Sequence, residues 1–187
     1  MKVSIGVSNR HVHLTKEHLE ILFGEGYELI KKTDINQPGQ FAATDLVTIK
    51  TNKSEINNVR ILGPIRKYTQ VEISKTDAYK LGLNPPVRDS GDLKGSEPIT
   101  IIGPKGSIDI KEGCIIANRH IHILPSQVSM YNLEGKDIVS VKIDGEKGGI
   151  INNVKLKVSK EAYFELHIDT DDANAHLIKN GDIGEIL

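Results

Sequence analysis

The chain lacks tryptophan altogether and has only five tyrosines and three phenylalanines among its 187 residues. Aromatic side chains form the stacking platforms of proteins that bind single-stranded nucleic acid, so their scarcity argues against that class. Neither sign of charge is in excess, because 24 basic and 25 acidic residues leave a net charge of −1. We therefore expect no surface suited to nucleic acid or to an anionic membrane.

Cysteine is also nearly absent, since Cys114 is the one thiol in the sequence. A single cysteine excludes an internal disulfide and is typical of a reducing compartment. It lies in an apolar run, which favours a buried structural thiol over a nucleophile. No apolar run reaches transmembrane length, and Met1 to Ile5 leads directly into a predicted strand without a signal peptide. These features predict a cytoplasmic protein.

What the sequence does contain is one short motif in two copies. Asn9–His13 and Asn118–His122 both read Asn-Arg-His-(Val/Ile)-His between aliphatic neighbours. Residues i and i+2 of a strand point to the same face, so each copy predicts a strand with two histidines on one face and aliphatic side chains on the other. The histidine pairs are His11 with His13 and His120 with His122. Two adjacent imidazoles are typical of a metal site.

Further segments repeat in the same order. Asp45–Lys50 returns as Asp137–Lys142, and Ile56–Val59 returns as Ile151–Val154. Their alternating pattern predicts mainly antiparallel strands. The sequence therefore predicts a mainly β fold of two barrel modules that arose by duplication and are capped by short helices. Two copies are too few for a solenoid.

Capping residues place helices within the first copy. Thr15 begins a predicted helix that ends near Phe23, before Gly24, and Ser74 begins another that ends near Leu81, before Gly82. The stretch from residue 31 to residue 41 contains Gln-Pro-Gly and is predicted to be turn-like.

The repeat also superposes Glu72 on His167, each with aliphatic neighbours that should face the opposite way. Each module therefore offers a third donor beside its histidine pair. The two candidate metal sets are His11, His13 and Glu72, and His120, His122 and His167. Two-His-one-Glu and three-His are both catalytic zinc sets that leave one coordination position open. Which three donors share an ion is left open, since adjacent histidines could serve different ions.

Two arginines stand outside the repeat. Arg66 follows Gly63-Pro64, and Arg88 shortly precedes Ser90 and Gly91. Features present in one half of a duplication are candidates for substrate binding, and an arginine fork beside backbone amides and a hydroxyl suits phosphate. The arginines of the repeated motif, Arg10 and Arg119, are expected to brace the histidine strands by pairing with carboxylates.

Taken together, these motifs resemble the PduL-type phosphate acyltransferases (phosphate propanoyltransferases or phosphotransacylases). The resemblance covers essentially the whole chain. It is carried by Ser8–Leu14, Gly63–Ser74, Val87–Gly91, Asn118–His122 and Leu166–Asp171.

The resemblance implies a fold, a reaction and roles for residues. It implies two β-barrels with two zinc ions between them, and a leading strand that crosses to the other barrel. The modules are then 10–117, and 118–187 with strand 1–9. The reaction is reversible acyl transfer between coenzyme A and inorganic phosphate, with acyl-CoA and acyl phosphate as partners of the site. The six donors above are implied as zinc ligands and Arg66 as the catalytic residue; Arg88, Ser90 and Gly91 are expected to bind substrate.

Other questions stay open at this point. Acetyl or propanoyl preference and self-association into a homo-oligomer are undecided. The alternative function is a dinuclear zinc hydrolase that acts on a thioester or a phosphoester. A zinc-stabilised binding module without turnover predicts closed, cysteine-rich sites, which one cysteine cannot supply.

Overall fold

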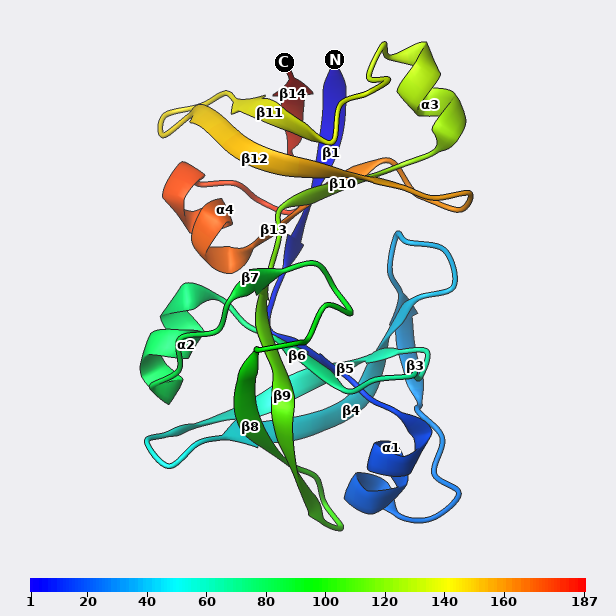
Figure 1. The fold of residues 1–187 in the computed structure, drawn as a ribbon, viewed down its shortest axis with the longest axis vertical. Coiled ribbons are helices and arrows are strands. Elements are labelled where there is room, and N and C mark those ends of the chain that lie inside the picture. Colours follow the sequence, from blue (N-terminus) through cyan, green and yellow to red (C-terminus); the bar gives the residue numbers. More distant parts are fainter. The chain divides into compact units, whose positions relative to one another are not determined.

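The computed structural model describes residues 1–187 and is built mainly from strands. The chain divides into two compact units, one made of Arg10–Ala117 and the other of Asn118–Leu187 together with Met1–Asn9. Each unit contains a closed β-barrel of six strands and two short helices (Figure 1). The predicted class, a mainly β chain of two barrels with short helices, is confirmed.

We call Arg10–Ala117 the first barrel. Its elements are β2 (His11–His13), α1 (Lys16–Phe23), β3 (Lys31–Asp34), β4 (Phe41–Lys50), β5 (Glu55–Gly63), β6 (Gln70–Glu72), α2 (Lys75–Leu81), β7 (Val87–Arg88), β8 (Glu97–Ile102) and β9 (Ser107–Ala117). Strands β4, β5, β2, β6, β9 and β8 are hydrogen-bonded in that order, and β8 pairs with β4 to close the ring. Strand β3 adds to β4, and β7 adds to β9.

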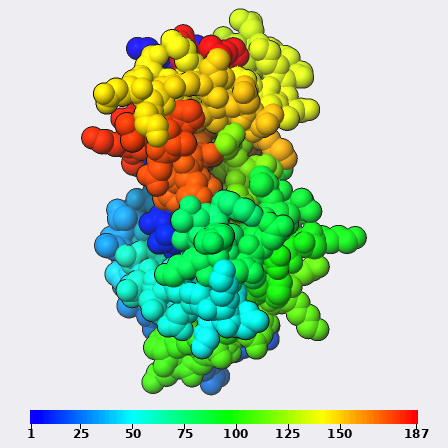
Figure 2. Space-filling view, turned by 90° about the vertical axis from the view of Figure 1, so that its left-hand side faces the viewer, coloured from blue at the N-terminus to red at the C-terminus, as the bar shows by residue number.

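The other unit is the second barrel. Its elements are β1 (Lys2–Ser8), β10 (His120–Ile123), α3 (Pro125–Met130), β11 (Ile138–Ile143), β12 (Gly149–Val158), β13 (Glu165–Asp169), α4 (Thr170–His176) and β14 (Ile183–Ile186). The ring runs β1, β13, β10, β12, β11, β14 and returns to β1. Strands β11 and β12, yellow to orange, form much of the surface of this barrel in the space-filling view (Figure 2).

The two rings have the same pairing pattern. The histidine strand β2 is parallel to β5 and antiparallel to β6, as β10 is parallel to β12 and antiparallel to β13. Even the irregularities repeat, because Asn58 and Asn153, at equivalent positions, both adopt a left-handed backbone with φ of 58°. The duplication read from the sequence therefore extends to strand order, direction and local backbone conformation.

One strand of each barrel continues along the chain into the histidine strand of the other barrel. Strand β1 is parallel to β13 in the second barrel, as β9 is parallel to β6 in the first. Yet β1 leads directly into β2 of the first barrel, and β9 leads directly into β10 of the second. Each histidine strand is thus preceded in sequence by a strand of the other barrel.

Alternation along the histidine strands gives each barrel its core. Val12 and Leu14 are fully buried in the core of the first barrel, and Ile121 and Ile123 are fully buried in the core of the second. The intervening histidines face away from those cores, as the period of two requires. Cys114 also lies in the first core. Burial, with added repulsion from Glu97 and Asp77, raises the pKa of its thiol to about 12, so a nucleophilic thiolate is not available at neutral pH.

Both predicted helix starts are confirmed. The Thr15 side chain accepts the backbone N–H of His18 at α1, and the Ser74 side chain accepts that of Asp77 at α2. The predicted turn from residue 31 to residue 41 is wrong in part, since Lys31–Asp34 forms β3 against β4. No helix in the chain has the length and apolar character that crossing a bilayer requires.

The placement of β1 leads to a stability prediction. Ile5 is fully buried in the core of the second barrel. Replacing Ile5 with alanine removes buried methyl groups and leaves a cavity, which should lower the free energy of unfolding by about 2–5 kcal/mol. Amide hydrogen exchange should then show faster opening in residues 118–187, far along the sequence.

The matched control is Ile101→Ala, because Ile101 is equally buried in the first barrel. That variant should speed exchange in residues 10–117 instead. Loss of protection within 10–117 after Ile5→Ala, with 118–187 unaffected, would contradict the assignment of β1 to the second barrel.

Candidate active site

One predicted donor set forms on the face of β2 and β6 in the first barrel. His11 and Glu72 lie directly opposite each other in the antiparallel register. Nε2 of His11 is 3.4 Å from Oε2 of Glu72, and Nε2 of His13 is 4.0 Å from Oε1. The donor atoms of these three residues all lie within 4.8 Å of one another. The arrangement could hold a metal ion.

The state of His13 suits that purpose. Its Nδ1 lies 3.2 Å from the carbonyl oxygen of Leu62. Because a carbonyl can only accept, Nδ1 carries the proton and Nε2 keeps the lone pair. Burial lowers the pKa of His13 to about 3, with the nearby His11 and Arg66 adding to the effect. The imidazole is therefore neutral at pH 7, as a ligand must be.

The second set forms in the equivalent place, on β10 and β13 of the second barrel. His120 lies opposite His167 in the register, and the three rings have centroids 4.8 to 5.2 Å apart. Nε2 of His120 is 3.2 Å from Nε2 of His122. His120 donates Nδ1–H to the Asn118 carbonyl at 2.8 Å, which leaves its Nε2 as the donor nitrogen.

Burial also keeps His122 neutral. Its pKa falls to about 3, chiefly through desolvation and further through the nearby His120 and His167. Three imidazoles, or two imidazoles with a carboxylate, are donor sets that zinc accepts while keeping a fourth position open. The chemistry of both sets therefore fits a zinc ion, and neither set includes a thiol.

Arg66 belongs to a hydrogen-bonded network that reaches the first donor set. Its Nη1 donates to the hydroxyl oxygen of Ser90 at 2.9 Å. The same oxygen accepts from the Gln70 amide at 2.9 Å, and that amide also donates to Oε1 of Glu72 at 2.5 Å. The backbone N–H of Gly91 donates to Oε1 of Gln70 at 2.7 Å. The structure thus brings Arg66, Ser90 and Gly91 together with Glu72, through Gln70.

Further contacts hold Arg66 in place. Nη1 lies 3.3 Å from the Tyr68 hydroxyl, and Nη2 lies 3.5 Å from Oε1 of Gln40. Gly91 has φ of 95°, in the left-handed region that favours glycine, and a Cβ there would come within 3.1 Å of the Tyr68 hydroxyl. The loop conformation that presents Ser90 to Arg66 therefore depends on glycine at this position.

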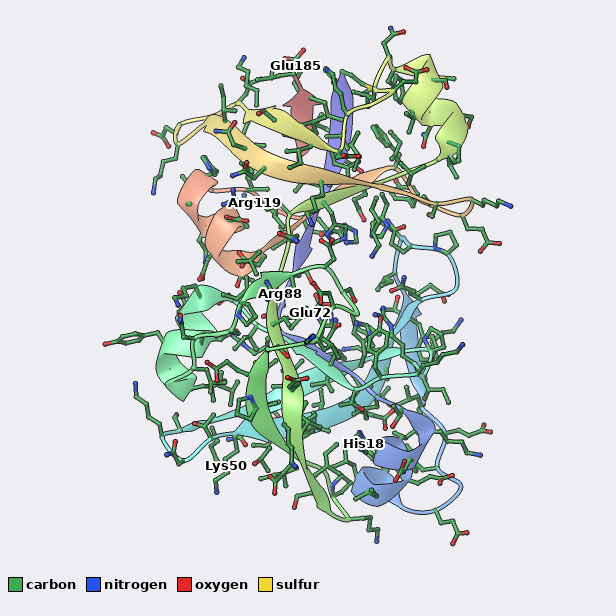
Figure 3. All side chains as sticks on the ribbon, in the orientation of Figure 1. His18, Lys50, Glu72, Arg88, Arg119 and Glu185 are labelled. Atoms are coloured by element: carbon green, nitrogen blue, oxygen red, sulfur yellow. The ribbon has the colours of Figure 1, made fainter.

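Arg88 does not join this network. It lies on β7 of the same barrel, a strand separate from the β6 that carries Glu72 (Figure 3). Its Nη1 donates to the carbonyl oxygen of Val87 at 3.3 Å, and its Nε lies 3.6 Å from a carboxylate oxygen of Asp92. A substrate-binding role for Arg88 stays a prediction.

Sequence reasoning missed two residues of these sites, Gln70 and Glu165. Glu165 is 5% exposed, and its Oε2 lies 2.7 Å from Nε2 of His167. Gln70 occupies the equivalent position in the first barrel, since it lies opposite His13 as Glu165 lies opposite His122. Strand alternation could have predicted both residues, because each lies two positions before a predicted donor and therefore on the same face of the strand.

The arginines of the repeated motif brace the histidine strands, as predicted. Arg10 makes two bonds of 2.8 Å to the carboxylate of Asp77. Arg119 makes bonds of 2.7 and 2.6 Å to Asp172 and lies beside α4 (Figure 3). The bond to Asp172 raises the pKa of Arg119 further. Each pair ties the start of a histidine strand to the helix that follows the third donor.

The chain is similar to known proteins over nearly its whole length. A family model described as phosphate propanoyltransferase matches residues 4–179. A phosphate propanoyltransferase of Thermotoga maritima is 52% identical over 186 residues, which cover 99% of this chain and 89% of the relative. That of Lachnoclostridium phytofermentans is 54% identical, with 99% and 87% covered. That of Salmonella typhimurium is 45% identical over 174 residues, with 92% and 82% covered.

The chain has a donor set on each of its two barrels, and the set on the first barrel is hydrogen-bonded to Arg66 through Gln70 and Ser90. Its relatives share the name phosphate propanoyltransferase, and the match covers most of their length. The protein is an enzyme, a phosphate acyltransferase. It belongs to the phosphate propanoyltransferase family.

Proposed function

We propose that the enzyme transfers a short acyl group reversibly between coenzyme A and inorganic phosphate, with one zinc ion at each donor set. The observation that carries the proposal is the network from Arg66 through Ser90 and Gln70 to Glu72. It joins a group that binds anions to a group that binds metal. Such a pairing suits a phosphate nucleophile that must approach a polarised carbonyl.

The relatives' name supports one choice of acyl group. They are called phosphate propanoyltransferases, which supports a propanoyl substrate. An acetyl group is shorter by a single methylene, and one methylene in a pocket is worth only about 1–3 kcal/mol of discrimination. We therefore propose that the enzyme accepts both propanoyl-CoA and acetyl-CoA.

Each metal set is assigned by its donors. His11, His13 and Glu72 would hold one zinc ion, and His120, His122 and His167 would hold the other. A bound zinc ion supplies a Lewis acid for the thioester carbonyl and a favoured partner for the coenzyme A sulfur. The hydrogen bonds from His13 to Leu62 and from His120 to Asn118 place the proton of the neutral ring on Nδ1, which leaves Nε2 as the donor nitrogen and orients the ring before an ion arrives.

The protein's own part in the reaction centres on Arg66. In the forward direction a phosphate oxygen bonds to the acyl carbon and the carbon–sulfur bond breaks, so coenzyme A leaves as a thiolate. Negative charge develops close to a nucleophile that is already negative. The Arg66 guanidinium orients the phosphate and offsets that repulsion. Ser90, whose oxygen accepts from Arg66 and Gln70, has its hydroxyl hydrogen to donate to a phosphate oxygen.

The loop residues complete substrate binding. We assign the Ser90 hydroxyl to the phosphate site and give Gly91 an indirect part in it, since the Gly91 N–H donates to Gln70 and orients the amide that contacts Ser90. Arg88 is assigned to the nucleotide phosphates of coenzyme A, because its half-exposed guanidinium is held only by Asp92 and a neighbouring carbonyl oxygen. This division predicts different kinetic effects for the two arginines.

The direct test of the function is phosphate dependence. Purified enzyme with propanoyl-CoA or acetyl-CoA should release coenzyme A only when inorganic phosphate is present, and acyl phosphate should accumulate in equal amount. A thiol-reactive dye and a hydroxamate assay measure the two products. Release of coenzyme A at the same rate without phosphate would replace the transferase by a zinc hydrolase.

The second prediction concerns the metal. Elemental analysis should find about two zinc equivalents per chain, because each donor set provides three ligands. A strong chelator should remove both zinc ions and the activity, and added zinc should restore them. His11→Ala and His120→Ala should each lose about one equivalent. Full activity in metal-free protein would refute the assignment.

The third prediction concerns Arg66. Replacing it with alanine removes a preorganised charge partner, which is typically worth about 100- to 1,000-fold in rate. Phosphate-dependent turnover should fall by that factor while the zinc content stays the same. Lysine should restore only part of the rate, because a point charge does not reproduce a two-pronged fork.

Arg88→Ala is the matched control for Arg66→Ala. It should raise the KM for acyl-CoA and leave kcat much less affected. Equal losses of kcat in the two variants would show that Arg66 has no special position at the reacting phosphate.

A further inference from the structure

The residue two positions before each third metal donor has a distinctive chemistry. In the first barrel Gln70 precedes Glu72, and in the second Glu165 precedes His167. Each of these two residues lies on the strand of its donor and opposite the second histidine of its own barrel. Gln70 is opposite His13, and Glu165 is opposite His122. Each set therefore consists of four side chains, two on each of two antiparallel strands.

Gln70 and Glu165 play opposite parts in hydrogen bonding: Gln70 donates to Glu72, whereas Glu165 accepts from His167. Glu72 can only accept when ionised, and Gln70 presents an amide that donates to it at 2.5 Å. His167 has a ring nitrogen that can donate, and Glu165 presents a carboxylate oxygen 2.7 Å from its Nε2. The change from Glu to His at one position is thus matched by a change from Gln to Glu at the other.

The second barrel also makes room for this carboxylate. Gly6 of β1 lies opposite His167, whereas Ile115 of β9 lies opposite Glu72 in the first barrel. A Cβ at Gly6 would lie 2.9 Å from Cδ of Glu165 and 3.1 Å from Cδ2 of His167. The space that a side chain would fill at this position is occupied by the Glu165–His167 pair.

Glu165 lies outside the set of donors itself. The group of side chains whose donor atoms come within 4.8 Å of one another contains the three histidines of the second barrel and not Glu165. Two other histidines of the donor sets donate Nδ1–H to a backbone carbonyl oxygen, His13 to that of Leu62 and His120 to that of Asn118. For His167 the corresponding acceptor is Glu165.

We propose that Glu165 is a positioning residue that acts through His167. By accepting Nε2–H it orients the ring and leaves Nδ1 as the nitrogen that binds the metal. The inference rests on the proposed function, which assigns a metal ion to His120, His122 and His167. It assigns to Glu165 a role that Gln70 fills in the first barrel with the opposite polarity.

The test is metal binding rather than turnover. Chelator-treated wild type, Glu165→Ala and Glu165→Gln are titrated with Co²⁺, with a chromophoric chelator as competitor. Loss of a carboxylate that supports a metal-binding histidine typically lowers affinity by about 10- to 100-fold. Glu165→Ala should weaken one of two Co²⁺ sites by that factor. Glu165→Gln should weaken it less, since the amide oxygen can still accept from His167.

A spectrum separates positioning from direct ligation. At saturating Co²⁺, Glu165→Ala should retain both ions and the visible absorption bands of the wild type, because the ligands are unchanged. Glu185→Ala is the matched control, as Glu185 is an exposed glutamate of the same barrel, near the N-terminal amine (Figure 3). It should bind both ions with wild-type affinity.

Gly6→Ala provides a variant that keeps the carboxylate but displaces it. It should weaken the same site, whereas a merely structural change would lower the melting temperature without altering Co²⁺ affinity. Wild-type affinity in both Glu165→Ala and Gly6→Ala would overturn the inference. A changed band intensity in Glu165→Ala would overturn it too, by making Glu165 a ligand. A wild-type chain that binds no Co²⁺ would instead overturn the metal sites of the proposed function, and this inference with them.

Discussion

Both candidate metal sites depend on one constraint, the antiparallel register between a histidine strand and the strand that carries the third donor. Directly opposite residues in such a ladder have Cβ atoms about 4.5–5.5 Å apart. That spacing places His11 beside Glu72 and His120 beside His167 without any loop that has to be ordered. A slip by one residue would turn every donor into the core and every aliphatic neighbour out of it. The hydrophobic pattern that builds the barrels therefore also sets the geometry of the donors.

The register is held from several directions. The pairs Arg10–Asp77 and Arg119–Asp172 fix the beginning of each histidine strand to a helix, and β9 and β1 flank the third-donor strands in parallel. Each flanking strand continues into the histidine strand of the other barrel. The segments β1–β2 and β9–β10 therefore each contribute one strand to both rings. This connection explains why the sequence runs from strand to motif without a spacer in both copies.

The sequence was sufficient for the parts of the site that follow from local periodicity. Histidines at i and i+2, capping by Thr15 and Ser74, and the match of Glu72 with His167 all depend on patterns within short segments or on direct comparison of the repeats. The strand at Lys31–Asp34 could not be read in this way. All its residues are exposed, so it has no apolar alternation, and it exists because β4 offers an edge to pair with. Tertiary pairing outweighs local pattern at such a strand.

Gln70 and Glu165 show a different limit. The repeat is recognised from positions where its two copies have the same or similar residues. Gln70 and Glu165 occupy equivalent positions but differ in residue type, and their difference is what carries information. Their significance appears only when the hydrogen bonds to Glu72 and His167 are known. The third donor and the residue that hydrogen-bonds it differ together between the two barrels, Glu72 with Gln70 in the first and His167 with Glu165 in the second. In the first barrel the Gln70 amide also donates to the Ser90 hydroxyl, which accepts from Arg66, so one amide links the candidate metal donor Glu72 to the arginine that we propose handles phosphate. In the second barrel a buried carboxylate stands where that amide stands in the first. The two barrels therefore share a scaffold but differ in the residues around the third donor. The network that links Arg66 to Glu72 lies in the first barrel, which is where our proposal places phosphate.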